Sequence, residues 1–259
     1  MSPAALAARL RAAGSVFAED EARVLLAAGG DLEALVARRV AGEPLEAVVG
    51  WAEFCGLRIA VEPGVFVPRR RTELLAREAA ALVLPGAVVV DLCCGTGAVA
   101  AAVARLASPG EVHAADVDPT AVHCARRNVE PVGGSVWLGD LFGALPARLR
   151  GRVDVLAVNA PYVPTAAIAT MPPEARDFEA RLALDGGPDG LDVHRRIVGG
   201  AMSWLAPGAA VLIETSDRQA QATAALLAAA GLAVTVRRDD EVDGTVAVGM
   251  DLRGEEERA

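Results

Sequence analysis

Short apolar runs alternate with helical stretches along the chain from residue 88 onward. Val88 to Leu92 is almost entirely apolar and is followed by a glycine turn and an Ala-rich helix to about Leu106. Further strands are expected at 111–116, 135–138, 153–159 and 209–214, and further helices at 119–129 and 219–230. Continuous apolar strands that alternate with helices are typical of a parallel sheet covered on both faces. The pattern therefore predicts an α/β fold.

The first 70 residues follow a different pattern. Residues 1 to about 48 are expected to form short helices, with Ser2 and Asp31 as N-caps. Apolar residues among Gly and Pro over 51–67 predict a small β-hairpin, and helical spacing resumes at Thr72. We therefore divide the chain into a helical domain (1–48), a β-hairpin linker (49–70), an α/β domain (71–253) and a charged tail (254–259).

Composition narrows the class of protein. The 259 residues are 53% hydrophobic, yet no apolar run approaches the roughly 20 residues that span a bilayer, and no secretory pattern is present, so a cytoplasmic protein is expected. The net charge of −9 argues against strong non-specific binding to nucleic acid, which depends on neutralising phosphates. Four cysteines and three scattered histidines lack metal-ligand spacing, so we expect reduced thiols and no metal site.

The segment that joins the first apolar strand to its helix carries candidate chemistry. Asp91 lies at the end of the strand, and Cys93, Cys94, Gly95, Thr96 and Gly97 form the turn. The two glycines let the backbone approach a ligand closely. The turn lacks the first and last glycines of G-x-G-x-x-G, and an aspartate there would repel a pyrophosphate but attract an ammonium group. The loop therefore indicates the amino-acid end of S-adenosylmethionine.

The second strand ends in two aspartates that compete for one role. A carboxylate at this strand end can accept both hydroxyls of a ribose. Asp118 precedes Pro119 and is interpreted as the N-cap of the next helix. Asp116, with Val117 beside it, is therefore the predicted ribose ligand.

A third acidic position follows the third strand. Asp140 can accept a hydrogen bond from the amino group of an adenine, with Leu141 or Phe142 packed on the ring. The alternative is that Asp140 only closes a turn. The two preceding strand ends favour the role in binding a cofactor.

The motif Asn159-Ala160-Pro161-Tyr162 follows a later strand and is the candidate acceptor site. An amide or aromatic amine nitrogen is a poor nucleophile because its lone pair is delocalised. The Asn159 side-chain oxygen and the Ala160 carbonyl can accept both of its N–H protons and aim the lone pair at a methyl donor. Pro161 restricts Ala160 to an extended conformation, and Tyr162 offers a flat face to a planar substrate. The alternative is an Asn-x-Pro turn with a core aromatic.

These motifs together resemble the HemK/PrmC family of protein-(glutamine-N5) methyltransferases, which modify the Gly-Gly-Gln motif of peptide chain release factors. The resemblance covers most of the chain. Residues 42–57 are similar to the family's GEPL…G…EF.GL segment, 67–73 to IPRPETE, 91–97 to its cofactor loop and 159–162 to NPPY. Residues 183–191 match AL.GG.DGL, which is more specific to the family than the loop.

The resemblance implies a fold and a set of roles. The fold would be a Rossmann-like, seven-stranded class I methyltransferase domain with a β-hairpin linker and a small helical N-terminal domain that helps to select the substrate. S-adenosylmethionine would be the cofactor, and a release factor would be the partner in translation termination. Asn159 and the Ala160 carbonyl would hold the glutamine amide. Residues 93–97, Asp116, Asp140 and Leu141 would line the cofactor pocket, and Asn159 is expected to contact the cofactor as well as the acceptor.

Three departures from the family's pattern lie at the predicted site. Cys93 replaces the first glycine of the loop, and Ala160 replaces the first proline of NPPY, where only a backbone carbonyl is needed. The run Arg69-Arg70-Arg71-Thr72-Glu73 replaces RPETE. This change removes one carboxylate and adds positive charge near the cofactor entrance.

Three other functions are compatible with these residues. N6-adenine methylation of nucleic acid uses a similar motif but needs base flipping and a basic groove, which the net charge opposes and Arg69 to Arg71 favour. A small-molecule amine is a second possible acceptor. A cofactor-binding partner protein without turnover is the third, and the polar grip of Asn159 with Tyr162 argues against it.

Overall fold

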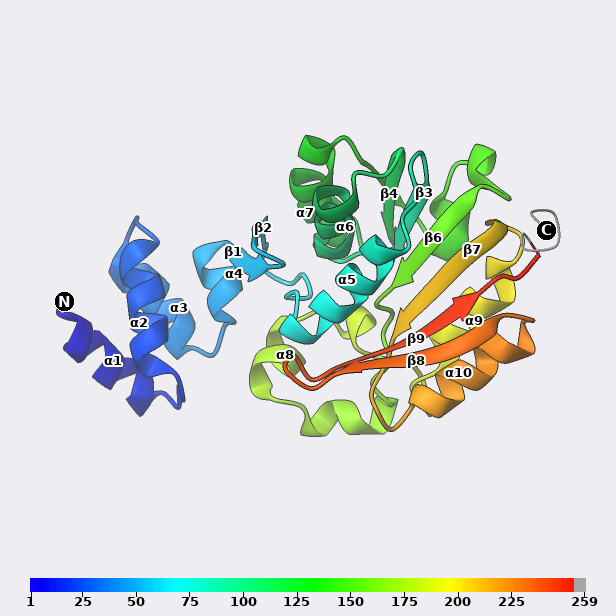
Figure 1. Ribbon diagram of the computed structural model, residues 1–259. Coiled ribbons are helices and arrows are strands. Elements are labelled where there is room, and N and C mark those ends of the chain that lie inside the picture. The colour runs from blue at the N-terminus through cyan, green and yellow to red at the C-terminus, as the bar shows by residue number, and fades with distance from the viewer. Residues whose placement is uncertain (254–259) are drawn as a thin grey trace.

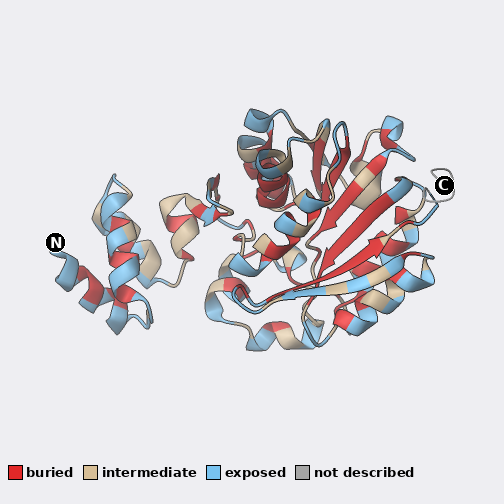
Figure 2. Ribbon diagram, viewed as in Figure 1, coloured by how far each residue is buried: buried red, intermediate tan, exposed pale blue. Residues whose placement is uncertain are grey.

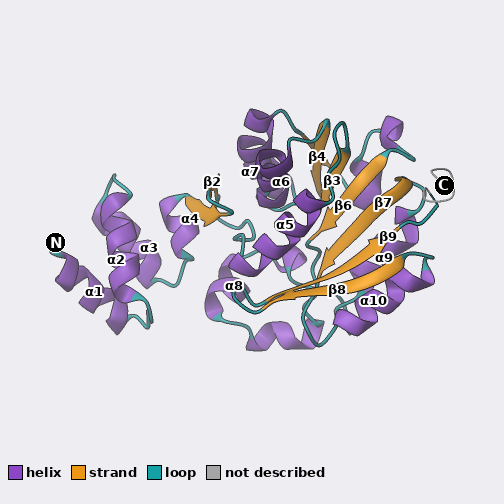
Figure 3. Ribbon diagram, in the orientation of Figure 1, coloured by secondary structure: helices purple, strands orange, loops and turns teal. Residues whose placement is uncertain are grey.

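A seven-stranded sheet forms the centre of the computed structural model, which describes residues 1–253 (Figures 1 and 3). The strands lie in the order β5-β4-β3-β6-β7-β9-β8. Their bounds are β3 (Val88–Leu92), β4 (Glu111–Asp116), β5 (Ser135–Leu138), β6 (Val153–Val158), β7 (Leu205–Glu214), β8 (Ala233–Asp239) and β9 (Gly244–Met250). The predicted tail at 254–259 lies outside the described residues.

The expectation of a parallel sheet is wrong at one edge. Pairing is parallel from β5 through to β7, but β9 pairs antiparallel with both β7 and β8. Only residues 240–243 join β8 to β9, and so short a connection permits only an antiparallel pair. The sequence analysis predicted neither β8 nor β9. The edge strand β8 alternates between exposed and half-buried positions and carries Arg237 and Arg238, so it has no continuous apolar run.

Successive residues of the inner strands face two different layers of helices. On one face, Val90 and Leu156 pack with α9 (Asp192–Ala201) and α10 (Ala220–Ala229). On the other face, Val89 and Val155 pack with α5 (Glu73–Ala81) and α6 (Ala98–Ala107), and α7 (Pro119–Val129) lies beside α6. This alternation is why the inner strands are buried along almost their whole length (Figure 2).

Four short helices precede the β-hairpin: α1 (Pro3–Ala12), α2 (Ala18–Ala27), α3 (Leu32–Val40) and α4 (Leu45–Val49). They enclose a small core of their own that includes Leu6, Leu10 and Leu25. Both predicted N-caps are confirmed, because the side chains of Ser2 and Asp31 accept hydrogen bonds from backbone N–H groups of α1 and α3. The boundaries of the domains stay a prediction. No helix within residues 1–253 is long and apolar enough to cross a membrane.

Side chains of α7 tie the hairpin of β1 (Trp51–Phe54) and β2 (Leu57–Ala60) to the α/β domain, and one of them, Cys124, donates its thiol to Ala60 O at 3.3 Å. Asn128 accepts a hydrogen bond from Ala60 N (2.8 Å) and donates to Ala60 O (3.0 Å) and to Thr96 O (2.8 Å). Thr96 belongs to the predicted cofactor loop. Asn128 therefore joins the linker and the loop across more than thirty residues of sequence on either side.

We expect Asn128→Ala to lower the free energy of unfolding by about 2 kcal/mol, because it leaves Ala60 N–H and the Thr96 carbonyl without this partner and removes one of the two donors to the Ala60 carbonyl. Urea unfolding followed by tryptophan fluorescence measures this loss. Arg126→Ala, at an exposed position of the same helix, is the control and should change stability by less than about 0.5 kcal/mol. Equal losses in the two variants would contradict the role of Asn128.

Candidate active site

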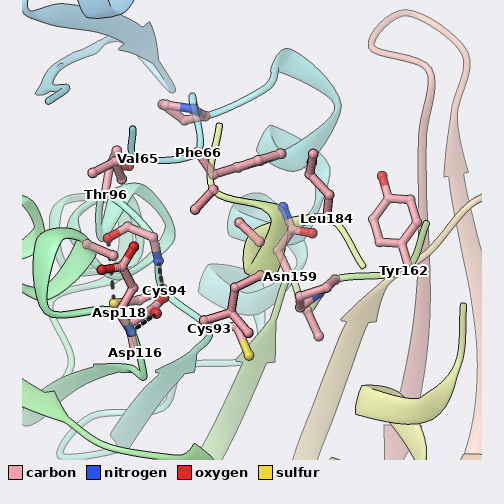
Figure 4. A pocket seen from close by; sticks show the side chains of 18 of the residues that line it. Val65, Phe66, Cys93, Cys94, Thr96, Asp116, Asp118, Asn159, Tyr162 and Leu184 are labelled. Atoms are coloured by element: carbon pink, nitrogen blue, oxygen red, sulfur yellow. Dashed lines mark hydrogen bonds between the residues drawn. The ribbon is translucent and has the colours of Figure 1, made fainter. Parts of the chain in front are cut away.

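A cavity of about 750 Å³ lies at the carboxyl ends of β3, β4 and β6 (Figure 4). In parallel sheets this edge is where ligands bind. Except for Gly97 and Phe142, all the residues predicted to bind cofactor or acceptor are among those that line it: Asp91, Cys93, Cys94, Gly95, Thr96, Asp116, Val117, Asp140, Leu141, Asn159, Ala160, Pro161 and Tyr162. The structure therefore brings these residues together, and their roles stay predictions.

Asp91 is a buried carboxylate at the floor of the cavity. Its side chain is 1% exposed, and Oδ2 accepts a hydrogen bond from Ala100 N of α6 at 3.0 Å. Burial raises the pKa of Asp91 to about 7, against the opposing effect of that N–H group. A carboxyl group in this state is poised to bind a cation and lose its proton.

The turn after β3 depends on unusual backbone angles. Cys93, Gly95 and Gly97 have φ values of +58°, +53° and +74°. Gly97 does not line the cavity but meets α7, since a Cβ at this position would lie 2.6 Å from Cγ2 of Val129. Gly97 therefore has a packing role that brings α6 close to α7, and its contact with the cofactor stays a prediction.

The two aspartates after β4 have separate tasks. Asp118 Oδ1 accepts from Thr120 N at 2.8 Å, so Asp118 is the N-cap of α7, as interpreted from the sequence. The carboxylate of Asp116 accepts from Gly95 N and from Asp118 N, each at 2.9 Å. Each Asp116 oxygen keeps a lone pair for a further donor. Burial raises the pKa of Asp116, and these backbone N–H groups act against that rise.

Asp140 lies at the mouth of the cavity and is paired with a residue that the sequence patterns did not single out. Its Oδ2 accepts from Arg196 Nη2 of α9 at 2.6 Å. Leu141 lines the cavity, whereas Phe142 stacks on Trp204 in the core, with ring centroids 5.7 Å apart. Of the two side chains proposed to cover an adenine, only Leu141 is in a position to do so.

The acceptor motif extends from the end of β6, and Asn159 lies between Asp116 and Tyr162 in Figure 4. Asn159 Nδ2 donates to Thr72 Oγ1 at 3.3 Å, which leaves Oδ1 free to accept from a ligand. Ala160 is 1% exposed, and Tyr162 donates its hydroxyl to Glu214 Oε1 at 3.3 Å. Thr72 was missed as a site residue because it lies 87 positions before its partner.

The wall of the cavity opposite the cofactor loop comes from the segment between β6 and α9, which includes α8 (Pro173–Phe178). Met171, Leu182 and Leu184 make much of this wall apolar. Glu174 also reaches the helical N-terminal region, where it is paired with Arg39 at 2.7 Å. The first helices are therefore attached directly to a segment that lines the cavity.

The cysteines of the loop are thiols held in an apolar setting. Cys55, Cys93, Cys94 and Cys124 are all free. Burial raises the pKa values of Cys93 and Cys94, so neither is a ready thiolate nucleophile. Within residues 1–253, no group of His, Cys, Asp and Glu has the geometry of a metal site.

We expect Gly97→Ala to lower the free energy of unfolding by about 3 kcal/mol, because backbone strain at φ +74° adds to the overlap with Val129. Chemical denaturation measures the loss. Gly133→Ala is the matched control, since Gly133 has φ +83° but no atom within 4 Å of a new Cβ. That control should lose only about 1 kcal/mol, and an equal loss at Gly97 would refute the packing role.

The sheet order, the glycine loop and the acidic strand ends define the fold as a Rossmann-like class I methyltransferase. Residues 56–171 match the family model described as "Methyltransferase small domain". A solved methyltransferase from Pyrococcus furiosus superposes with a TM-score of 0.58, at 18% identity, over 75% of this chain and 89% of its own. This likeness supports the fold alone.

Comparison with sequence relatives identifies the family of methyltransferases to which the chain belongs. The chain is 39% identical to the release factor glutamine methyltransferase of Geobacter sulfurreducens, over 76% of this chain and 69% of that protein. It belongs to the release factor glutamine methyltransferase family. Another relative, 38% identical over 76% of this chain and 69% of its own length, is the 4-amino-L-phenylalanine/4-methylamino-L-phenylalanine methyltransferase of Streptomyces pristinaespiralis.

Proposed function

We propose that this protein transfers a methyl group from S-adenosylmethionine to the side-chain amide nitrogen of a glutamine in a peptide chain release factor. The observation that carries the proposal is the position of Asn159, whose free amide oxygen lies in the same cavity as the Asp91 and Asp116 carboxylates. A hydrogen-bond acceptor for an amide N–H therefore stands beside a pocket with acidic groups suited to the cofactor. Membership of the release factor glutamine methyltransferase family supports a glutamine of a release factor as the methyl acceptor.

The residues fit the proposed cofactor group by group. The Asp91 carboxylate suits an ammonium group, and the free lone pairs of Asp116 suit the two hydroxyls of a ribose. Val117 and Leu141 supply apolar surface for an adenine, and Asp140 supplies an acceptor for its amino group. The turn over residues 93–96 lies between these ends. When bound, S-adenosylmethionine supplies an electrophilic methyl group on a sulfonium.

The acceptor loop prepares the nitrogen for attack. The Asn159 Oδ1 atom and the Ala160 carbonyl would accept the two N–H groups of the glutamine amide and orient its lone pair. Pro161 keeps Ala160 extended, so an alanine can replace the usual proline without loss of the carbonyl. The nitrogen would then take the methyl group, forming a C–N bond as the S–CH₃ bond breaks, and would lose its extra proton to water because methylation makes it acidic.

The proposal also includes a protein partner and a cellular location. The helical domain over 1–48 and the linker over 49–70 would bind the release factor, because Arg39 and Glu174 connect these helices to the cavity wall. Translation termination takes place in the cytoplasm, which is therefore the proposed location. The net charge of −9 suits a protein partner better than bare nucleic acid.

A small-molecule amine is a second candidate acceptor, and two observations favour it. The relative from Streptomyces pristinaespiralis is named for methylating a free amino acid with an aromatic amine. Here Arg71, which the family's usual motif lacks, lines the cavity and is exposed, so it is able to bind a carboxylate. The release factor remains the leading proposal because relatives from four organisms, 36–41% identical to this chain, are named release factor glutamine methyltransferases.

We expect labelled S-adenosylmethionine to methylate a purified release factor at one glutamine, as mapped by mass spectrometry, and Asn159→Ala to lower kcat on the order of 10²-fold. Cofactor affinity, measured by calorimetry, should survive in the variant because Asp91 and Asp116 are intact. Transfer to 4-amino-L-phenylalanine, with none to release factors, would overturn the proposed substrate and favour the second candidate.

We expect cofactor affinity to rise about tenfold between pH 6 and pH 8. Only the deprotonated carboxylate attracts an ammonium group, and burial raises the pKa of Asp91 to about 7, so about nine-tenths of it is protonated at pH 6. Calorimetric titration across this range tests the prediction. Asp91→Asn should bind more weakly and with little dependence on pH. A flat profile in the unaltered protein would contradict the role of Asp91.

A further inference from the structure

Tyr162 is held at both ends by residues from one segment, the stretch that joins β7 to α10. At the backbone, Gln219 Nε2 donates to the Tyr162 carbonyl at 3.0 Å. At the ring, the Tyr162 hydroxyl donates to Glu214 Oε1 at 3.3 Å. Glu214 ends β7 and Gln219 precedes α10. Within residues 1–253, neither is among the side chains that line the cavity, so both act on the site through Tyr162.

Gln219 is fixed in the orientation that this contact needs. Ser216 Oγ donates to Gln219 Oε1 at 2.6 Å, so the amide oxygen faces the serine and the NH₂ group faces two carbonyls. The second carbonyl is that of Asp189, also at 3.0 Å. Gly190 allows this close approach, because a Cβ there would lie 2.3 Å from the Tyr162 oxygen and 2.4 Å from Gln219 Nε2. The Asp189-Gly190 pair thus serves the acceptor loop.

Glu214 is a costly group that packing alone does not explain. It is 1% exposed, and within residues 1–253 its Oε2 atom has no hydrogen-bond partner. Burial raises the pKa of Glu214 to about 7, although Thr72, Arg71 and Tyr162 act against the rise. An apolar side chain would fill the same space more cheaply, but only a polar group can hold the Tyr162 hydroxyl.

We propose that Glu214 and Gln219 are positioning residues that together fix the ring and the backbone of Tyr162 against the acceptor amide. The inference rests on the proposed function, since it names the residues that orient the same acceptor loop. A loop held at one end only would let the ring turn away from a planar substrate, and a shift of about 1 Å at such a site lowers the rate about 10²-fold. The cofactor side of the cavity would be unaffected.

Two pairs of variants separate positioning from space filling. Gln219→Glu keeps the shape but sets an acceptor against two carbonyls, and should lower kcat/KM for the release factor about 10²-fold without weakening cofactor binding. Glu214→Ala should lose a similar factor, whereas Glu214→Gln, which keeps an oxygen for Tyr162, should recover most of the loss. Arg218→Ala, an exposed neighbour, is the control and should match the unaltered protein.

Tyr162 is the only tyrosine of the chain, so tyrosine labelled with carbon-13 at Cζ alone gives a single NMR signal from this residue. The signal should shift or broaden in Gln219→Glu and Glu214→Ala and stay in place in Arg218→Ala. Unchanged signals in the first two variants, or activity losses matched by lost cofactor affinity, would overturn the inference. If the unaltered protein methylates no release factor, the proposed function fails, while the tyrosine signal still decides whether these residues position Tyr162.

Discussion

Parallel pairing of β3 with β4 on one side and β6 on the other is the constraint on which the site depends. The register places Leu92 opposite both Ala115 and Val158, so all three strands end at the same level. The residues that follow them, among them Asp116 and Asn159, therefore meet across one edge although they are far apart in the chain. An antiparallel partner in place of β4 or β6 would present its amino end there and dissolve the cavity.

Several carboxyl groups at this edge of the sheet are buried, and burial makes their charged form less stable. Asp91, Asp116 and Glu214 all have pKa values raised by the loss of water. Backbone N–H groups of the loop and of α6 compensate for part of this at the two aspartates, and the Tyr162 hydroxyl does so at Glu214. Acidic groups held in this way are typical of functional sites, where a ligand completes their partners.

Long-range side-chain contacts attach the first 70 residues to this edge. Asn128 joins the hairpin to the cofactor loop, and the Arg39–Glu174 pair joins α3 to the cavity wall. An ion pair between two exposed side chains contributes little to the free energy of unfolding. Arg39, however, is only about a tenth exposed and also binds Glu21, so it holds the helices in a defined place beside the cavity.

The local pattern of apolar, capping and glycine residues predicted most of the strands and helices of this protein. Strands that are buried on both faces are apolar along their whole length, so the bounds of Val88–Leu92 and Glu111–Asp116 were predicted correctly. Pro119 and its N-cap Asp118 marked the start of α7. The acidic and glycine residues at the strand ends likewise gave the location of the cavity. Strands β8 and β9 and their antiparallel pairing were not predicted, and β8 lacks a strand signal because an edge strand needs no continuous apolar run.

Only the tertiary structure shows which residues far apart in the chain contact one another at the site. Thr72, Gln219 and Glu214 contact the acceptor loop from positions more than fifty residues away, and no periodicity in the chain records such a contact. The conformational freedom of Gly97 is visible in the sequence, whereas its close approach to Val129 of α7 is visible only in the structure. The sequence determines which groups reach the edge of the sheet, and side-chain packing across the fold determines what each group faces.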